Sequence, residues 1–209
     1  MPQDSEIHKE LIKTAKKHHP EIAKLLKANG VLAIEARDEK DLFNFLARTV
    51  TGQQLSTAVA KTIWGRLKKY ASENKTSLKK LCIKKNEAKL RACGLSKNKI
   101  TALIGLHKAF ENKEISKQKI LKADYEGITE MVASLWGFGQ WSADIVAIFY
   151  VCHADIWPVG DGAIVRGVKK YAGDSESSID VANYYSPYRT YLALHIWKGL
   201  DAEKLAKSK

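Results

Sequence analysis

Residues 135–144 read LWGFGQWSAD and place two glycines one residue apart among three large aromatic side chains, those of Trp136, Phe138 and Trp141. The segments on both sides have apolar residues at helical spacing, so the glycines interrupt two helices of roughly 8–12 residues. Glycine readily adopts the positive φ that a tight turn between helices needs. The backbone N–H groups at the start of the second helix can bind an anion such as a phosphate group, but taken alone the pattern is more often an ordinary glycine-terminated turn.

The composition is that of an ordinary globular protein. The chain has 209 residues, of which 45% are hydrophobic and 28% charged, enough for one core or for two small lobes. It has no apolar run of about 18 residues, and its first ten residues lack the pattern of a secretory signal. We therefore expect a cytoplasmic protein without a membrane segment.

The cysteines exclude several kinds of site. Cys82, Cys93 and Cys152 are an odd number and form no CxxC pair. Neither a disulfide framework nor a four-cysteine zinc or iron–sulfur site can be built from them, so free thiols are expected.

The net charge is the first indication of function. The chain carries 35 Lys and Arg against 23 Asp and Glu, a net charge of +12. Such an excess favours a polyanionic partner, because each phosphate that a Lys or Arg neutralises releases condensed counterions. A protein that is merely basic remains the alternative.

Most of the chain has helical periodicity, which predicts an all-α fold of about ten helices. Helices are expected over 4–18 and 20–29, over 38–50 with Asp38 as the cap, over about 54–70, and in short lysine-rich segments within 75–122. Only residues 30–36 suggest a strand.

Caps and breakers define several helix ends. Pro20 suits a helix start and Gly30 a helix end, while Gly94 and Ser96 should stop one helix and cap the next. Near the C-terminus, Ser186 and Pro187 are expected in cap and first-turn positions of a helix that Gly199 ends.

Four motifs together resemble a known family. They are the hairpin in residues 135–144, the segment IWPVGDGAIVRGV (156–168), the segment TVTGQQLSTAVA (49–60) and the segment SPYRTYLALHIWKGLD (186–201). Their types and order resemble the helix–hairpin–helix DNA glycosylases, and the last motif is similar to that of the alkylpurine branch. The likeness extends over roughly residues 40–201.

The resemblance implies two helical lobes with an active-site cleft between them. A discontinuous terminal lobe would comprise residues 1–49 and 156–209, and a central lobe of residues 50–155 would contain the helix–hairpin–helix motif. The implied activity is base excision repair by a DNA glycosylase that flips out an alkylated, cationic purine such as 3-methyladenine or 7-methylguanine and hydrolyses its N-glycosidic bond.

Asp161 is the catalytic candidate. Cleavage of the bond from a base to C1′ passes through a transition state that resembles an oxocarbenium ion, which a nearby carboxylate stabilises. Asp161 also suits the N-cap of the next helix, and the two roles are compatible. Bifunctional members of the family carry a Schiff-base lysine where this chain has Trp141, so the resemblance implies a monofunctional enzyme without lyase activity.

The resemblance assigns the remaining site residues by position. A base pocket would use the aromatic side chains of Trp141, Trp197 and Tyr185, because stacking and cation–π attraction hold a flipped cationic base. For Tyr185 a core position is the favoured alternative. DNA would contact the hairpin and the loop that inserts a wedge through the minor groove. These DNA-binding residues would be Gly137, Gly139, Gln140, Gln53, Gln54 and Leu55, with Gln54 or Leu55 as the wedge.

Other positions carry weaker implications. A monovalent cation (Na⁺ or K⁺) would bind the backbone carbonyls of three hairpin residues, and no other cofactor is expected. These residues are Ala133, Leu135 and Phe138. Trp136 replaces the family's usual proline, Arg189 is expected to join the two lobes through an ion pair, and His153 is more consistent with a structural role than with a general acid.

The expected partner is double-stranded DNA, bound by a monomer. Two alternatives stay open: a glycosylase for an oxidised or deaminated base, and a helix–hairpin–helix protein that binds DNA without catalysis.

Overall fold

The computed structural model describes residues 2–36 and 39–207, and over these residues its regular secondary structure is all helix, with no strand. The predicted all-α fold is confirmed. Residues 30–36 form an extended connection, so the expected strand was wrong: no second strand exists in the described residues to pair with it. In the described part of the chain, no helix combines the length and apolar character that a membrane crossing requires.

The chain folds into two compact units. One comprises Met1–Ala36 and Cys152–Lys209, and the other comprises Arg37–Val151. We call them the terminal unit and the central unit. The observed boundaries lie at residues 36/37 and 151/152, whereas boundaries at 49/50 and 155/156 were expected. The largest difference concerns Leu42–Gly52, which packs within the central unit.

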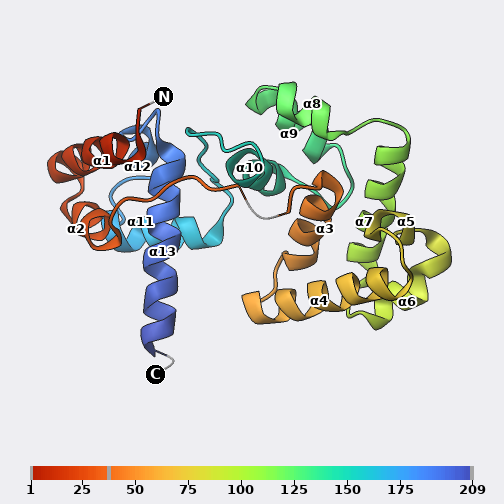
Figure 1. The fold of residues 1–209 in the computed structure, drawn as a ribbon. Helices are drawn as coiled ribbons and strands as arrows, with labels where there is room; N and C mark the ends of the chain where they lie inside the picture. The colour runs from red at the N-terminus through yellow and green to blue at the C-terminus, as the bar shows by residue number, and fades with distance from the viewer. Residues whose placement is uncertain (1, 37–38, 208–209) are drawn as a thin grey trace. The chain divides into compact units, whose positions relative to one another are not determined.

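The central unit contains eight α-helices and one 3₁₀ helix over its described residues (Figure 1). They are α3 (Leu42–Gly52), α4 (Thr57–Glu73), α5 (Leu78–Leu81), η1 (Lys84–Asn86), α6 (Glu87–Ala92), α7 (Lys97–Glu111), α8 (Lys117–Lys122), α9 (Tyr125–Ala133) and α10 (Gln140–Phe149). Helix α3 contacts α4, α7 and α10, because apolar side chains occupy most of its surface. It is therefore the core helix of this unit.

Side-chain caps fix where the central helices begin. Ser96 Oγ accepts a hydrogen bond from the N–H of Lys99, as predicted, and Ser56 caps α4, which therefore begins at Thr57. Helix α3 is capped by Asp41, while the expected cap, Asp38, lies outside the described residues.

The terminal unit contains five helices over its described residues: α1 (Asp4–His18), α2 (Pro20–Asn29), α11 (Gly162–Ala172), α12 (Ser178–Asn183) and α13 (Arg189–Lys207). Figure 1 shows α13 running beside α2 and α11, and all three contact one another. Helix α13 continues through Gly199, so the expected helix end there was wrong. A Cβ at Gly199 would lie 2.5 Å from Leu25 Cδ1 and 2.9 Å from the Tyr171 hydroxyl, so the glycine allows α13 to approach its neighbours.

The start of α13 also differs from the prediction. The Ser186–Pro187 bond is cis, and the helix begins at Arg189, so these two residues do not occupy the cap and first turn. The Ser186 hydroxyl instead donates to Asp155 Oδ2 at 3.0 Å.

The positive charge is divided unequally between the units. Residues 37–151 contain 21 Lys and Arg against 11 Asp and Glu, whereas the remainder contains 14 against 12. The central unit therefore carries most of the excess charge that indicates a polyanionic partner.

Candidate active site and nucleic-acid interface

The two hairpin glycines are required for different reasons. Gly137 has a φ of +84°, and a Cβ added there would lie 2.8 Å from the Cβ of Ala102 on α7. Gly139 has a φ of −139°, which any residue adopts, and an added Cβ would meet nothing within 4 Å. The fold therefore explains the glycine at 137 and leaves the one at 139 for another explanation.

Gly139 is the N-cap of α10, and among the residues that the structure describes no side chain caps this helix. The first N–H groups of a helix have no acceptor within it, and the macrodipole places partial positive charge there. The hairpin thus presents a helix N-terminus without a bulky side chain at its cap, an arrangement suited to an anion.

The side chain of Gln140 is hydrogen-bonded to two hairpin residues, although Gln140 itself is exposed. Its Nε2 donates to the Tyr125 hydroxyl at 2.8 Å and to Asp144 Oδ1 at 2.9 Å, and the Tyr125 hydroxyl donates to the same carboxylate oxygen at 2.6 Å. Asp144 is fully buried, and burial together with this carboxylate raises the pKa of Tyr125 well above its ordinary value. A DNA contact by Gln140 would therefore come from its backbone N–H.

The loop after α3 is fastened to the hairpin through Gln53. Its Nε2 donates to the Gly137 carbonyl and to Ser142 Oγ, both at 3.2 Å. Gln54 has a φ of +56° and is exposed, and Leu55 is 38% exposed. Gln53 thus positions the loop, and the two residues expected as the wedge are those that face solvent.

Lys99 of α7 holds the backbone of the same loop. Its Nζ donates to the carbonyls of Thr51 and Gln53 at 2.7 and 2.8 Å, so a positive charge lies at the C-terminal end of α3, where the macrodipole is negative. Partial burial lowers the pKa of Lys99.

Trp141 is half-buried in the first turn of α10.

The expected cation ligands are at the end of α9, which is Ala133, and in the hairpin turn, which contains Leu135 and Phe138. The Leu135 carbonyl accepts the N–H of Phe138 at 3.0 Å and keeps a second lone pair, while Ala133 is the last residue of α9. Neutral carbonyl oxygens near a helix C-terminus are suitable ligands for a hard cation.

Asp161 caps α11 in the terminal unit. Its Oδ1 accepts the N–H groups of Ala163 and Ile164 at 2.8 and 2.9 Å, and the indole N–H of Trp197 at 3.3 Å. Three donors from two helices thus orient one carboxylate, whose negative charge lies at the positive end of the α11 dipole. The capping role expected from the sequence is confirmed.

The two pocket candidates of the terminal unit differ in position. Trp197 is half-buried beside Asp161. Tyr185 is only 2% exposed, belongs to the core cluster of this unit, and has its hydroxyl 3.0 Å from His19 Nδ1. The assignment of Tyr185 to a base pocket was therefore wrong, since its ring fills the core and cannot stack on a ligand.

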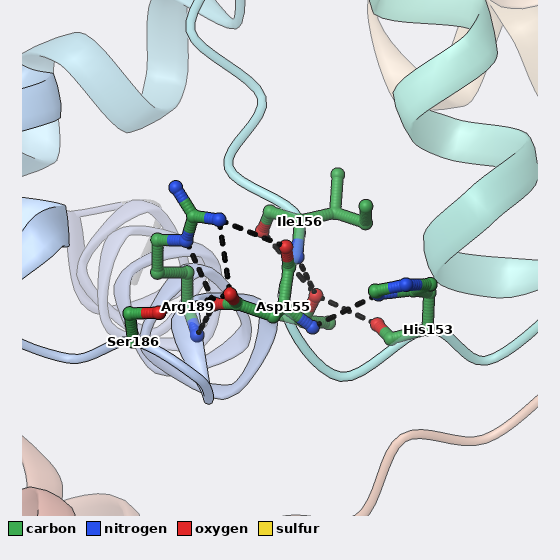
Figure 2. A network of polar contacts seen from close by, with 6 residues as sticks. His153, Asp155, Ile156, Ser186 and Arg189 are labelled. Atoms are coloured by element: carbon green, nitrogen blue, oxygen red, sulfur yellow. Dashed lines mark hydrogen bonds and ion pairs between the residues drawn. The ribbon is translucent and has the colours of Figure 1, made fainter. Parts of the chain in front are cut away.

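An ion pair between Asp155 and Arg189, drawn in Figure 2, anchors the segment that precedes Asp161 in the chain. Arg189 at the start of α13 donates through Nε to Asp155 Oδ1 at 2.7 Å and through Nη2 to Oδ2 at 2.9 Å. Although burial opposes it, hydrogen bonds from Arg189 and Ser186 lower the pKa of Asp155. Both charged partners belong to the terminal unit, so this pair does not join the two units as expected.

Thr190 extends the anchor. Its hydroxyl donates to the His153 carbonyl at 2.8 Å and accepts the N–H of Ile156 at 2.9 Å. His153 Nδ1 accepts the N–H of Asp155 (Figure 2). These bonds give His153 a structural role in the loop.

Two features were missed from the sequence: Asp155 as the partner in the expected ion pair of Arg189, and the network of Tyr125, Gln140 and Asp144. The spacing of Gln140 and Asp144, four residues apart on a helix, was a signal that could have indicated part of this network.

A family model described as "HhH-GPD superfamily base excision DNA repair protein" matches residues 47–183. This range contains the 53–55 loop, the hairpin and Asp161.

Individual relatives match over most of the chain. The fission yeast Schizosaccharomyces pombe protein named "Alkylbase DNA glycosidase-like protein mag2" is 26% identical over 89% of this chain and 92% of its own length. "DNA-3-methyladenine glycosylase 1" of the same yeast is 24% identical over 77% of this chain and 73% of its own.

Solved structures share the fold. The S. pombe 3-methyladenine DNA glycosylase Mag1 in complex with abasic DNA has a TM-score of 0.76 at 22% identity, covering 92% of this chain and 95% of that one. A DNA-3-methyladenine glycosidase from Bacillus halodurans has a TM-score of 0.73 at 24% identity, covering 90% and 88%.

Proposed function

Since the chain belongs to the HhH-GPD superfamily of base excision DNA repair proteins, we propose that it is a DNA glycosylase that removes alkylated purines from duplex DNA. The names of its relatives support this substrate class. The observation that carries the proposal is the carboxylate of Asp161, held at the start of α11 by two backbone N–H groups and the indole of Trp197.

The chemistry required of Asp161 is electrostatic. As the bond to the base lengthens, positive charge develops at C1′ and the ring oxygen of the deoxyribose, and a fixed carboxylate nearby stabilises it. The hydrogen bonds at Oδ1 hold the side chain in place, so little reorganisation accompanies the reaction. The same carboxylate can orient the water molecule that attacks C1′.

Cationic purines suit a site without a dedicated acid. A methylated purine already carries positive charge and leaves as a neutral base, so no proton need be supplied. Either of the half-buried indoles, that of Trp141 or that of Trp197, can stack on such a base, with a cation–π attraction of about 0.5–2 kcal/mol. Their alignment with the family's pocket positions supports this role.

DNA would be held by the hairpin and the loop after α3. The open N-terminus of α10 is suited to a backbone phosphate, and the carbonyls of Ala133, Leu135 and Phe138 would hold a monovalent cation that contributes positive charge beside it. Gln54 or Leu55, exposed on a loop that Gln53 and Lys99 fix, would fill the space left by the flipped base.

The proposed enzyme leaves an abasic site and does not cut the strand. Trp141 occupies the position of the family's Schiff-base lysine, and an indole has no amine for covalent attack. Borohydride reduction during turnover tests this point: no covalent protein–DNA adduct is expected, and trapping of one would contradict the monofunctional assignment.

Substitution of Asp161 by Asn tests the catalytic assignment. Asparagine keeps an oxygen for the N-cap and loses the negative charge, so the protein should fold while release of methylated purine from methylated duplex falls at least about a hundredfold. Asp41→Asn is the matched control, because Asp41 also caps a helix but lies far along the chain from Asp161.

Unaltered purine release by Asp161→Asn would refute the assignment. Absence of release by the wild type, with DNA binding intact, would favour a protein that binds DNA without catalysis. Release of oxidised or deaminated bases alone, from oligonucleotides that each carry one lesion, would favour the other alternative. A cytoplasmic monomer without a membrane association stays a prediction from the sequence.

A further inference from the structure

Trp136 is an exposed aromatic residue that the proposed reaction does not use. Trp136 directly precedes Gly137 of the hairpin in the chain. It is 55% exposed, although tryptophan is usually largely buried. It lies where the hairpin packs on α7, since Gly137 approaches Ala102 of that helix.

Two hollows flank Trp136, and its side chain lines both. The first has a volume of about 320 Å³ and is lined by the end of α3, the following loop and the start of α7. The second, of about 240 Å³, is lined by Lys84, Glu87 and the exposed face of α7 as far as Lys108. Trp136 is therefore part of the wall of both hollows, which lie in the same unit.

The first hollow has the polar groups that could contact a planar heterocycle. Gln54 and Asn98 contribute amides, which donate and accept hydrogen bonds, and Ser96 contributes a hydroxyl, while Gln53 lines the wall with its amide hydrogens bonded to the hairpin. We call this hollow with Trp136 the α7 pocket. Lys99 adds positive charge at its wall, in the unit that carries most of the excess charge.

We propose that the α7 pocket binds one nucleobase of the DNA strand, stacked on the indole of Trp136. This proposal rests on the proposed function, because the hairpin that would hold a phosphate is continuous with Trp136 in the chain. A base next to that phosphate is within reach of the indole, since successive residues and successive nucleotides are each only a few ångströms apart.

Physical reasons favour a nucleobase over a protein partner. The pocket combines one aromatic face with amides and a lysine, the combination that binds unpaired bases through stacking and edge contacts. The core of a protein interface is depleted of charged residues. Around Trp136 the walls instead combine apolar side chains with the charged side chains of Lys84, Glu87, Lys99 and Lys108.

Substitution of Trp136 tests the stacking contact. Binding of a duplex with a non-cleavable abasic analogue, measured by fluorescence anisotropy at fixed salt, should weaken about tenfold in Trp136→Ala and recover largely in Trp136→Phe. Leu121→Ala is the matched control, because Leu121 is 50% exposed on α8 of the same unit. Thermal unfolding should be nearly unchanged in all three variants.

A double-mutant cycle identifies the base. Bases around the lesion position are removed one at a time, and each duplex is bound by the wild type and by Trp136→Ala. The proposal predicts one nucleotide whose removal weakens the wild type about tenfold and the variant hardly at all. Equal binding by the variant and the wild type, or the absence of any coupled nucleotide, would overturn it.

The same measurements separate this proposal from the function on which it rests. If the coupled nucleotide is found but no methylated purine is released, the α7 pocket stands and the glycosylase assignment fails. If purine is released but no coupling is found, the assignment stands and the α7 pocket fails. A wild type that does not bind DNA overturns both.

Discussion

Substitution of each hairpin glycine by alanine tests whether Gly137 is required for folding and Gly139 for DNA binding. Gly137→Ala places a Cβ at a φ of +84°, which costs about 1–2 kcal/mol, and 2.8 Å from the Cβ of Ala102, where overpacking costs about 1–3 kcal/mol. Gly139→Ala meets no atom within 4 Å at an ordinary φ, so its cost should stay below about 1 kcal/mol.

In DNA binding, Gly139→Ala should have the larger effect of the two substitutions. A methyl group at position 139 obstructs the approach of a phosphate to the N–H groups of α10, and each hydrogen bond to a charged group contributes about 1.5–3 kcal/mol. We therefore expect Gly139→Ala to bind an undamaged duplex at least about tenfold more weakly while it unfolds in urea near the wild-type midpoint. The reasoning is refuted if Gly139→Ala binds DNA like the wild type, or if Gly137→Ala is as stable as the wild type.

Three further predictions concern stability. Burial lowers the pKa of His195 to about 3. Between pH 7 and pH 5 this histidine therefore gains a proton in the unfolded state but stays neutral in the folded state. The free energy of unfolding should fall by about 2 kcal/mol over this pH range. This fall should shrink in His195→Gln, and urea titrations that give both proteins the same pH slope would contradict it. Lys99→Met leaves two carbonyls without their donor and should cost about 1–3 kcal/mol in urea unfolding, whereas Lys97→Met, exposed on the same helix, should cost little. Gly199→Ala should lower the melting temperature measured by circular dichroism, because its Cβ would meet Leu25 at 2.5 Å; an unchanged temperature would show that α2 and α13 can separate freely.

Local chemistry allowed much of the fold to be predicted. Ser96 and Asp161 cap helices as expected, since a cap depends on residues only two or three positions away. Gly199 was misinterpreted as a helix end because its reason is the approach of α2 and α11, which are distant in sequence.

Candidate site residues were subject to the same limit. Tyr185, next to the 186–201 motif, was a candidate for the base pocket, but its burial depends on packing in a core that includes residues of α1 and α2. The acidic partner of Arg189 could not be identified from the sequence either, because Asp155 lies 34 residues earlier and is one of many acidic residues. Residue type and spacing indicated which side chains could act, and long-range packing decided which of them remain accessible.

The unequal division of charge has a consequence for how such an enzyme would respond to its surroundings. The central unit holds nearly all of the excess positive charge, while Asp161 lies in a unit that is almost neutral. Salt weakens attraction to phosphates steeply but hardly affects a carboxylate once it faces a bound sugar. Ionic strength would therefore change how long the protein stays on DNA while it searches, and leave the speed of each excision nearly constant.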